Sequence, residues 1–263
     1  MNFYWVYDIP NWSFAVLVIG TSIGLALVGQ RFTRRWVKRI AGGDGQYNEL
    51  VGTTLSTVGV FFGMTLGLIS VGTWQTFADA SMNVNQETTS LAVLYRSVSV
   101  YDEPDRSALR DSLKEYVSYT IQEAWPIQRK GEIPTGDLAK ITDFQKKLVA
   151  YETESDTMNN LHALTLGAFN STIEHRRTRM QNVTTGLPDT LWWVVIFGAL
   201  LNIFIPWFLV YDRQVIQDLM IVLMAATIGL LIFMMGAMDN PFRGEFSVSA
   251  EPFEALLKWM QGI

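Results

Sequence analysis

Apolar residues gather in four long runs, and the longest of them, from Leu50 to Ala78, contains no charged residue. A run of that length can cross a bilayer as a helix. Shorter apolar runs lie at about 12–30, 191–211 and 215–238. The pattern therefore predicts an all-α integral membrane protein with four transmembrane helices arranged as two hairpins.

Polar sequence that keeps a helical period separates the two predicted hairpins. Apolar residues from Val84 to Val98 recur at the spacing of one helix face, and the same spacing continues further along the chain. Within this region Arg96 is expected to form an internal salt bridge with Glu87 or Glu123. The chain is thus expected to comprise an N-terminal hairpin, an extramembrane helical domain, a C-terminal hairpin and an interfacial amphipathic tail, at residues 1–78, 79–186, 187–238 and 239–263.

Small residues recur every three or four positions along the second span, so one narrow face of that helix carries no large side chain. Such stripes let helix backbones approach closely in lipid. The first span has a short stripe of its own, which could dock on that of the second. We therefore predict that the following glycines serve helix packing: Gly20, Gly24, Gly52, Gly59 and Gly67.

The second span also admits another interpretation, in which it lines a pore. Channels select and gate ions with rings of polar groups and with hydrophobic constrictions, and need no buried charge for it. Serine and threonine hydroxyls would supply the polar rings, and a phenylalanine would supply the constriction, although the same phenylalanines could equally face lipid. The candidate pore-lining residues are Ser56, Thr57, Phe61, Phe62, Gly63 and Ser70.

Charge and composition exclude several classes of function. The net charge is −5, and Lys and Arg are scattered, so nothing indicates a nucleic-acid partner. There are no cysteines, and the two histidines, His162 and His175, stand apart in polar helical sequence, so no metal site is predicted. Carboxylates lie on polar helix faces without a nucleophile beside them, so no catalytic site is predicted either. Apart from Asp218 near the start of the fourth run, the spans lack the ionisable groups that a coupled transporter uses.

Basic residues indicate on which side of the membrane each end of the first span lies. Five of them follow this span between Arg31 and Arg39, whereas none precedes it. Short cytoplasmic loops are enriched in Lys and Arg. The segment 31–49 is therefore expected in the cytoplasm, with the N-terminus and the domain 79–186 on the outer side of the membrane.

Several short motifs occur in an order that resembles the bestrophin-like family of bacterial four-helix membrane proteins. The resemblance covers nearly the whole chain, and it places the protein in a bacterial inner membrane. Its most specific motif is DNPFRG at 239–244, a turn to which the family match assigns Asp239, Asn240, Pro241, Phe242 and Gly244. The other motifs are NELVG at 48–52, Glu87, Leu91, LYR at 94–96, Tyr116, Trp125-Pro126, GLP at 186–188, VS at 248–249 and EPF at 251–253.

The resemblance implies an oligomeric anion channel, because bestrophins are such channels and have a calcium-dependent gate. The run of acids that supplies much of the bestrophin calcium site is missing here, since only Asp239 and Glu245 stand near the turn. No cofactor is therefore predicted, and calcium is implied by the family alone. On a purely structural interpretation, Asp239 caps the following turn, Phe242 anchors at the membrane interface and Arg243 reaches lipid phosphate.

The sequence is compatible with three functions. The first is a homo-oligomeric channel for small anions whose pore is lined by the second span. The second is a non-conducting membrane scaffold or sensor whose domain 79–186 binds a partner protein. The third is a stator-like subunit that conducts protons together with a partner.

Overall fold

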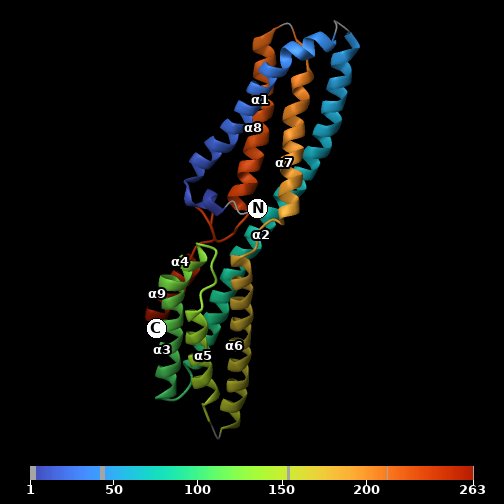
Figure 1. Cartoon of the computed structure of the whole chain (residues 1–263). Coiled ribbons are helices and arrows are strands. Elements are labelled where there is room, and N and C mark those ends of the chain that lie inside the picture. Colours follow the sequence, from blue (N-terminus) through green and yellow to red (C-terminus); the bar gives the residue numbers. More distant parts are fainter. Residues whose placement is uncertain (1–3, 42–44, 153–154, 212, 263) are drawn as a thin grey trace. The chain divides into compact units, whose positions relative to one another are not determined.

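The computed structural model describes residues 4–41, 45–152, 155–211 and 213–262 (Figure 1). This part of the chain is helical and contains no strand. It divides into two compact units, one of residues 1–75 and 186–239 and the other of residues 76–185 and 240–263, here called the membrane unit and the helical unit. The helices are η1 Tyr4–Asp8, α1 Asn11–Ala41, α2 Gly45–Val98, α3 Asp105–Tyr119, η2 Thr120–Ala124, α4 Trp125–Gln128, α5 Gly136–Val149, α6 Asp156–Val183, α7 Asp189–Phe204, η3 Ile205–Phe208, α8 Gln214–Met238 and α9 Glu251–Gly262.

Four helices of the described chain, α1, α2, α7 and α8, are long and apolar enough to cross a membrane. They correspond to the four predicted spans, so the all-α architecture with four membrane helices is confirmed. One difference is that α2 does not end with the apolar run. It continues as a single helix to Val98 and contributes residues to both units.

Within the membrane unit, α1 packs along α8 by means of small residues on α8. A Cβ added at Gly229 would lie 2.9 Å from the Cα of Ile19, and one added at Gly236 would lie 2.9 Å from the ring of Phe14. Real Cβ atoms do not approach backbone so closely, so a glycine is needed at position 229, whereas at position 236 the Phe14 ring would have to shift. The α1–α8 pair forms one side of the unit.

The second membrane helix joins this unit along one face, where Leu66 lies in an apolar cluster with Val195 of α7 and Met235 of α8. The ring of Phe62 lies against Gly198 of α7, where an added Cβ would be 2.3 Å from it. Near the start of α2, the side-chain amide of Asn48 donates to the carbonyl oxygen of Val210 at 2.7 Å and accepts from the Val210 N–H at 3.0 Å. This double hydrogen bond satisfies backbone groups just beyond η3, where no helix partner is present.

The helical unit has its own apolar core, formed by the second half of α2 with α3, α5, α6 and α9. Aromatic rings pack against one another there at centroid distances of 5.6 Å for Trp125 and Phe242 and 5.7 Å for Phe144 and Phe169. Such pairs stabilise a fold beyond the area they bury. Fully buried members of this core include Leu91, Leu94, Tyr95, Leu113, Tyr116, Phe144, Phe242 and Phe253.

The predicted interfacial tail at 239–263 is wrong. Helix α9 buries Phe253, Leu256 and Met260 in the core of the helical unit, and the Tyr95 hydroxyl donates to the carbonyl oxygen of Met260 at 2.9 Å. An amphipathic period shows that a helix has an apolar face but not whether protein or lipid covers that face. Here protein covers it.

Candidate functional site

The face of α2 that points away from α7 is open in the membrane unit. Val60, Met64 and Leu68 follow one another at intervals of four residues, so they share a helix face, and their exposed fractions are 56, 65 and 76%. The hydroxyls of Ser56 and Thr57, one turn before Val60, are also exposed, and that of Thr57 donates to the Thr53 carbonyl at 2.9 Å. This open face therefore combines hydroxyl groups with large apolar side chains.

The two adjacent phenylalanines of α2 have different environments. Phe61 is 68% exposed, whereas Phe62 packs against Gly198 and contributes to the apolar clusters of the membrane unit. Of the two constriction candidates, only Phe61 is therefore available to a path outside this chain. Ser70 is half-buried, and its hydroxyl donates to the carbonyl oxygen of Leu66 at 2.8 Å.

The small-residue stripe of α2 is largely uncovered. A Cβ added at Gly52, Gly63 or Gly67 would meet nothing within 4 Å, and one added at Gly59 would only touch the Asn202 side-chain oxygen at 3.4 Å. Added Cβ atoms at Gly20 and Gly24 of α1 would likewise meet nothing within 4 Å. The expected docking of the first span on this stripe is thus not made within the described chain, where α1 packs on α8 instead. A helix-packing role for these glycines stays a prediction.

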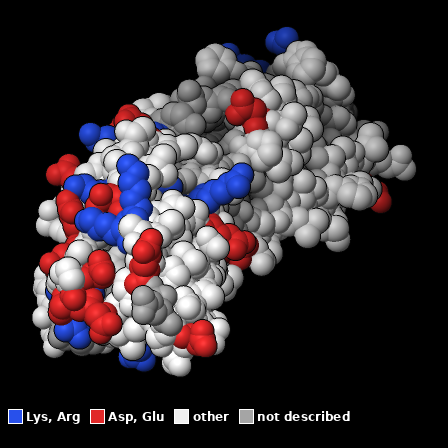
Figure 2. Space-filling model, turned by 90° about the horizontal axis from the view of Figure 1, so that it is seen from below, with Lys and Arg blue, Asp and Glu red and all other residues white. Residues whose placement is uncertain are grey.

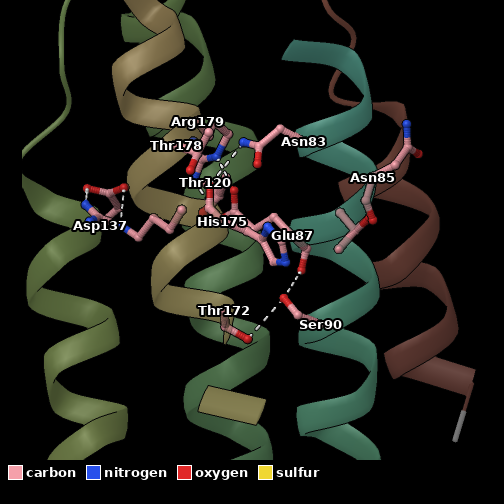
Figure 3. A network of polar contacts seen from close by, with 12 residues as sticks. Asn83, Asn85, Glu87, Ser90, Thr120, Asp137, Thr172, His175, Thr178 and Arg179 are labelled. Atoms are coloured by element: carbon pink, nitrogen blue, oxygen red, sulfur yellow. Dashed lines mark hydrogen bonds and ion pairs between the residues drawn. The ribbon is translucent and has the colours of Figure 1, made fainter. Parts of the chain in front are cut away.

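A fully buried ion pair lies in the helical unit, between α2 and α6 (Figure 3). The Glu87 carboxylate accepts two hydrogen bonds from Arg179, from Nε at 2.6 Å and from Nη2 at 3.0 Å. It also accepts one from the Tyr116 hydroxyl of α3 at 3.0 Å. The expected pairing of Glu87 with Arg96 is wrong, because the Arg96 guanidinium lies over the Trp259 ring instead, 5.8 Å from its centroid.

The surroundings of the buried pair raise the pKa of Arg179 and that of Tyr116. Burial, the largest single effect, lowers the pKa of Arg179, but Glu87, Tyr116 and Asp137 together outweigh it, so that pKa lies above its ordinary value. Burial, together with the Glu87 charge, raises the pKa of Tyr116, which therefore stays a hydrogen-bond donor. The guanidinium also lies 5.8 Å from the Trp125 ring centroid and 5.3 Å from that of Phe253.

More polar contacts extend this network along the same helices (Figure 3). Arg176, one helical turn before Arg179, forms a two-bond ion pair with the buried carboxylate of Asp137, at 3.1 and 2.8 Å. The Ser90 hydroxyl accepts a bond from that of Thr172 at 3.2 Å. Sequence reasoning treated the arginines at 176–179 only as a basic cluster beside the third span. The spacing of three residues between Arg176 and Arg179, which places both on one face of α6, was the available signal.

Outside this network, the charges of the helical unit form a mixed surface. Exposed ion pairs such as Arg106–Glu103 and Lys147–Asp143, both at 2.8 Å, recur on it. Figure 2 shows basic and acidic side chains interspersed on the visible face. A surface with both signs interspersed is typical of solvated protein and exerts no strong field of one sign.

The contacts of the DNPFRG turn differ from those expected from its sequence. The Asp239 carboxylate accepts hydrogen bonds from the backbone N–H of Leu187 and from Trp192 Nε1, so it binds the start of α7 rather than capping the turn that follows it. Burial raises the pKa of Asp239 in spite of these bonds. Phe242 is fully buried against Trp125, not anchored at an interface. The turn closes at Gly244, whose φ of +77° is a conformation that glycine adopts readily.

Comparison with known proteins identifies the architecture. The sequence profile of the Bestrophin-like domain matches residues 10–253. A crystal structure of a bacterial Bestrophin homologue from Klebsiella pneumoniae, solved by Zn-SAD phasing, is similar with a TM-score of 0.67 at 14% identity, covering 94% of this chain and 98% of that one. A single-residue variant of this homologue gives a TM-score of 0.68 at 12% identity, covering 95% and 99%. No curated protein sequence matches.

The motif residues named from the sequence also have a common place in the structure. Glu87, Tyr116, Trp125, Phe242 and Phe253 all lie in or against the one polar and apolar core of the helical unit. At such low identities the solved structures establish the fold, while the profile spans nearly the whole sequence. The chain therefore belongs to the Bestrophin-like family, as a multi-pass helical membrane protein.

Proposed function

We propose that this protein assembles with copies of itself into an ion channel whose path runs along the open face of α2. The observation that carries the proposal is the exposure of large apolar side chains on one face of α2, where Val60, Met64 and Leu68 are 56, 65 and 76% exposed. A helix of this kind, placed around a symmetry axis, would present the same face of each copy to a common path. A single four-helix unit is too small to enclose a wide aqueous pore.

The composition of the open face suits conduction with a dewetting constriction. Val60, Met64 and Leu68 would narrow the path, and the hydroxyls of Ser56 and Thr57 would provide polar groups next to them. The apolar stretch of α2 carries no acidic side chain that would attract cations. Together with the family membership, this favours small anions as the permeating species.

Recording from the purified protein in a planar bilayer, with unequal chloride and potassium gradients, tests the proposal. Discrete openings that reverse near the chloride equilibrium potential are the expected result. Silence from an assembled protein, with and without calcium, would contradict the channel proposal. It would favour the alternative of a membrane scaffold whose helical unit binds a partner protein.

Substitutions on α2 should distinguish effects on ion conduction from effects on folding and assembly. We expect Ser56→Leu and Thr57→Leu to reduce single-channel conductance by at least about twofold, because a larger apolar side chain replaces a hydroxyl on the path. Size-exclusion chromatography should show unchanged assembly. Thr227→Leu on α8 is the matched control, since that exposed hydroxyl also donates to the carbonyl four residues earlier, at 2.9 Å. Normal conductance in both α2 variants would mean that this face does not line the path.

The proposed orientation can be tested because the chain has no cysteine. We expect a Ser171→Cys variant to react with a membrane-impermeant maleimide from outside intact spheroplasts. A Gln46→Cys variant, beyond the basic end of α1, should react only after the membrane is opened. Both positions are exposed in the structure. The reverse pattern of labelling would place the helical unit in the cytoplasm.

A further inference from the structure

Two surface loops of the helical unit each carry one large apolar side chain that the unit does not cover. Ile133 lies in the loop between α4 and α5, and Phe246 lies in the loop between α8 and α9. Each of them is 52% exposed. Single exposed apolar residues are common on soluble proteins, so the exposure gains meaning only from what surrounds these two.

The first loop leaves α4 in a defined conformation. The N–H of Gly131 donates to the carbonyl oxygen of Gln128 at 2.8 Å, and that of Glu132 donates to the carbonyl oxygen of Ile127 at 3.3 Å. These are the two bonds of a Schellman motif, and Gly131 has the positive φ, +76°, that the motif requires. Ile133 follows directly, so an ordered backbone holds its side chain at the surface.

The second loop begins just beyond a membrane helix. Helix α8 ends at Met238, and Pro241 stands three residues later, so at most about 11 Å of chain separates them. The N–H of Val248 donates to the carbonyl oxygen of Pro241 at 2.8 Å, which closes the loop that carries Phe246. The headgroup layer beyond the hydrocarbon core is about 5–8 Å thick on each side. The base of this loop is therefore tied to the membrane boundary.

The two loops contact each other within the helical unit. The Arg129 guanidinium donates from Nη2 to the carbonyl oxygen of Gly244 at 3.4 Å. A Cβ added at Gly131 would overlap the guanidinium of Arg243, so this side chain lies directly against the first loop. The contacts place the first loop beside the loop that follows the membrane helix.

The charges around the two apolar side chains have both signs. Arg129 and Lys130 are exposed and Arg243 is half-buried, while Glu132 and Glu245 are exposed beside the apolar residues. Three basic and two acidic residues exert only a weak net attraction on an anionic surface. Arginine and lysine nevertheless bind phosphate directly, and every phospholipid carries one.

We propose that these two loops form a contact surface of the helical unit with the phospholipid bilayer. Phe246 and Ile133 insert at the boundary between headgroups and acyl chains, and Arg129 and Lys130 bind the lipid phosphates above them. The strength of such a contact depends chiefly on the apolar area that it buries. The proposal is independent of whether the protein conducts ions.

Spin labels on the full chain in phospholipid nanodiscs test the proposal, because the chain has no cysteine of its own. Phe246→Cys and Ile133→Cys would each carry a nitroxide label, which is itself apolar. Power saturation compares collisions of the label with oxygen, which concentrates in lipid, and with a water-soluble nickel chelate. We expect the oxygen-to-chelate ratio at both positions to exceed that of a water-exposed control at least about threefold.

Val149→Cys is the matched control, since Val149 is an apolar residue, 62% exposed, at the opposite end of α5 from the first loop. Its label should collide mainly with the chelate. Ratios at 133 and 246 equal to that at 149 would place both side chains in water and overturn the proposal. Protection from both reagents would show that protein, such as a second copy, covers them, and would also overturn it.

A second substitution tests whether the two loops act together. Phe246→Ser, combined with the label at 133, should lower the oxygen-to-chelate ratio there at least about twofold, because less apolar area remains to hold the loops in the bilayer. Leu164→Ser on α6, which replaces a side chain that is 73% exposed, should leave that ratio unchanged. An unchanged ratio in the Phe246→Ser variant would contradict a joint contact surface.

Discussion

Glu87→Gln should destabilise the helical unit by about 3–5 kcal/mol, since it leaves the charge of Arg179 buried without its partner. The two side chains are fully buried, and the pair is joined by bonds of 2.6 and 3.0 Å. For a chain of this size, we expect the melting temperature in detergent to fall by roughly 10 °C. Circular dichroism during heating would measure it.

Two variants serve as controls for this prediction. Asp143→Asn breaks the exposed pair with Lys147, and it should change the free energy of unfolding by less than about 1 kcal/mol. The double variant Glu87→Gln/Arg179→Met should be less destabilised than the sum of the single variants, because it removes the unpaired charge. An unchanged melting temperature in Glu87→Gln would show that the pair contributes little to folding.

Met64→Asp should convert the proposed channel from anion to cation selectivity. In a symmetric oligomer the substitution repeats in every copy, so the path would acquire a ring of negative charge at its narrow part. The reversal potential in unequal potassium chloride should therefore move from the chloride side to the potassium side. Recordings above pH 8 keep the introduced carboxylates ionised.

Met64→Gln provides the neutral comparison, since it introduces a polar side chain of similar size without charge. It should leave the sign of the reversal potential unchanged. If Met64→Asp assembles and conducts with the original selectivity, the open face of α2 lies away from the ion path. A path along another helix would then have to be sought.

The spans were accessible from sequence because bilayer thickness imposes a simple length rule on uncharged runs. The roles of neighbouring residues on those spans could not be predicted from the sequence. Phe61 and Phe62 are chemically identical, and only the close approach of Gly198 makes Phe62 an internal contact. A single sequence does not show which of the two meets that glycine.

Long-range pairing was beyond sequence reasoning for the same reason. Glu87 was recognised, but its partner Arg179 stands 92 positions later, and the spacing that puts Arg179 on one face with Arg176 does not tell which carboxylate it meets. Asp239 was assigned to its own turn, whereas its bonds go to the backbone of Leu187. In each case the packing of distant helices decided between partners of equal chemistry.

Tolerance to substitution at the uncovered glycines of α2 would report on contacts between copies of the protein. Since a Cβ added at Gly52, Gly63 or Gly67 meets nothing within 4 Å in the described part of the chain, substitutions at these positions would not test packing within one copy. A library of substitutions there, scored for survival of the assembled protein in the cell, would report on neighbouring molecules alone. Strict retention of glycine in such a screen would map where a second backbone comes closest.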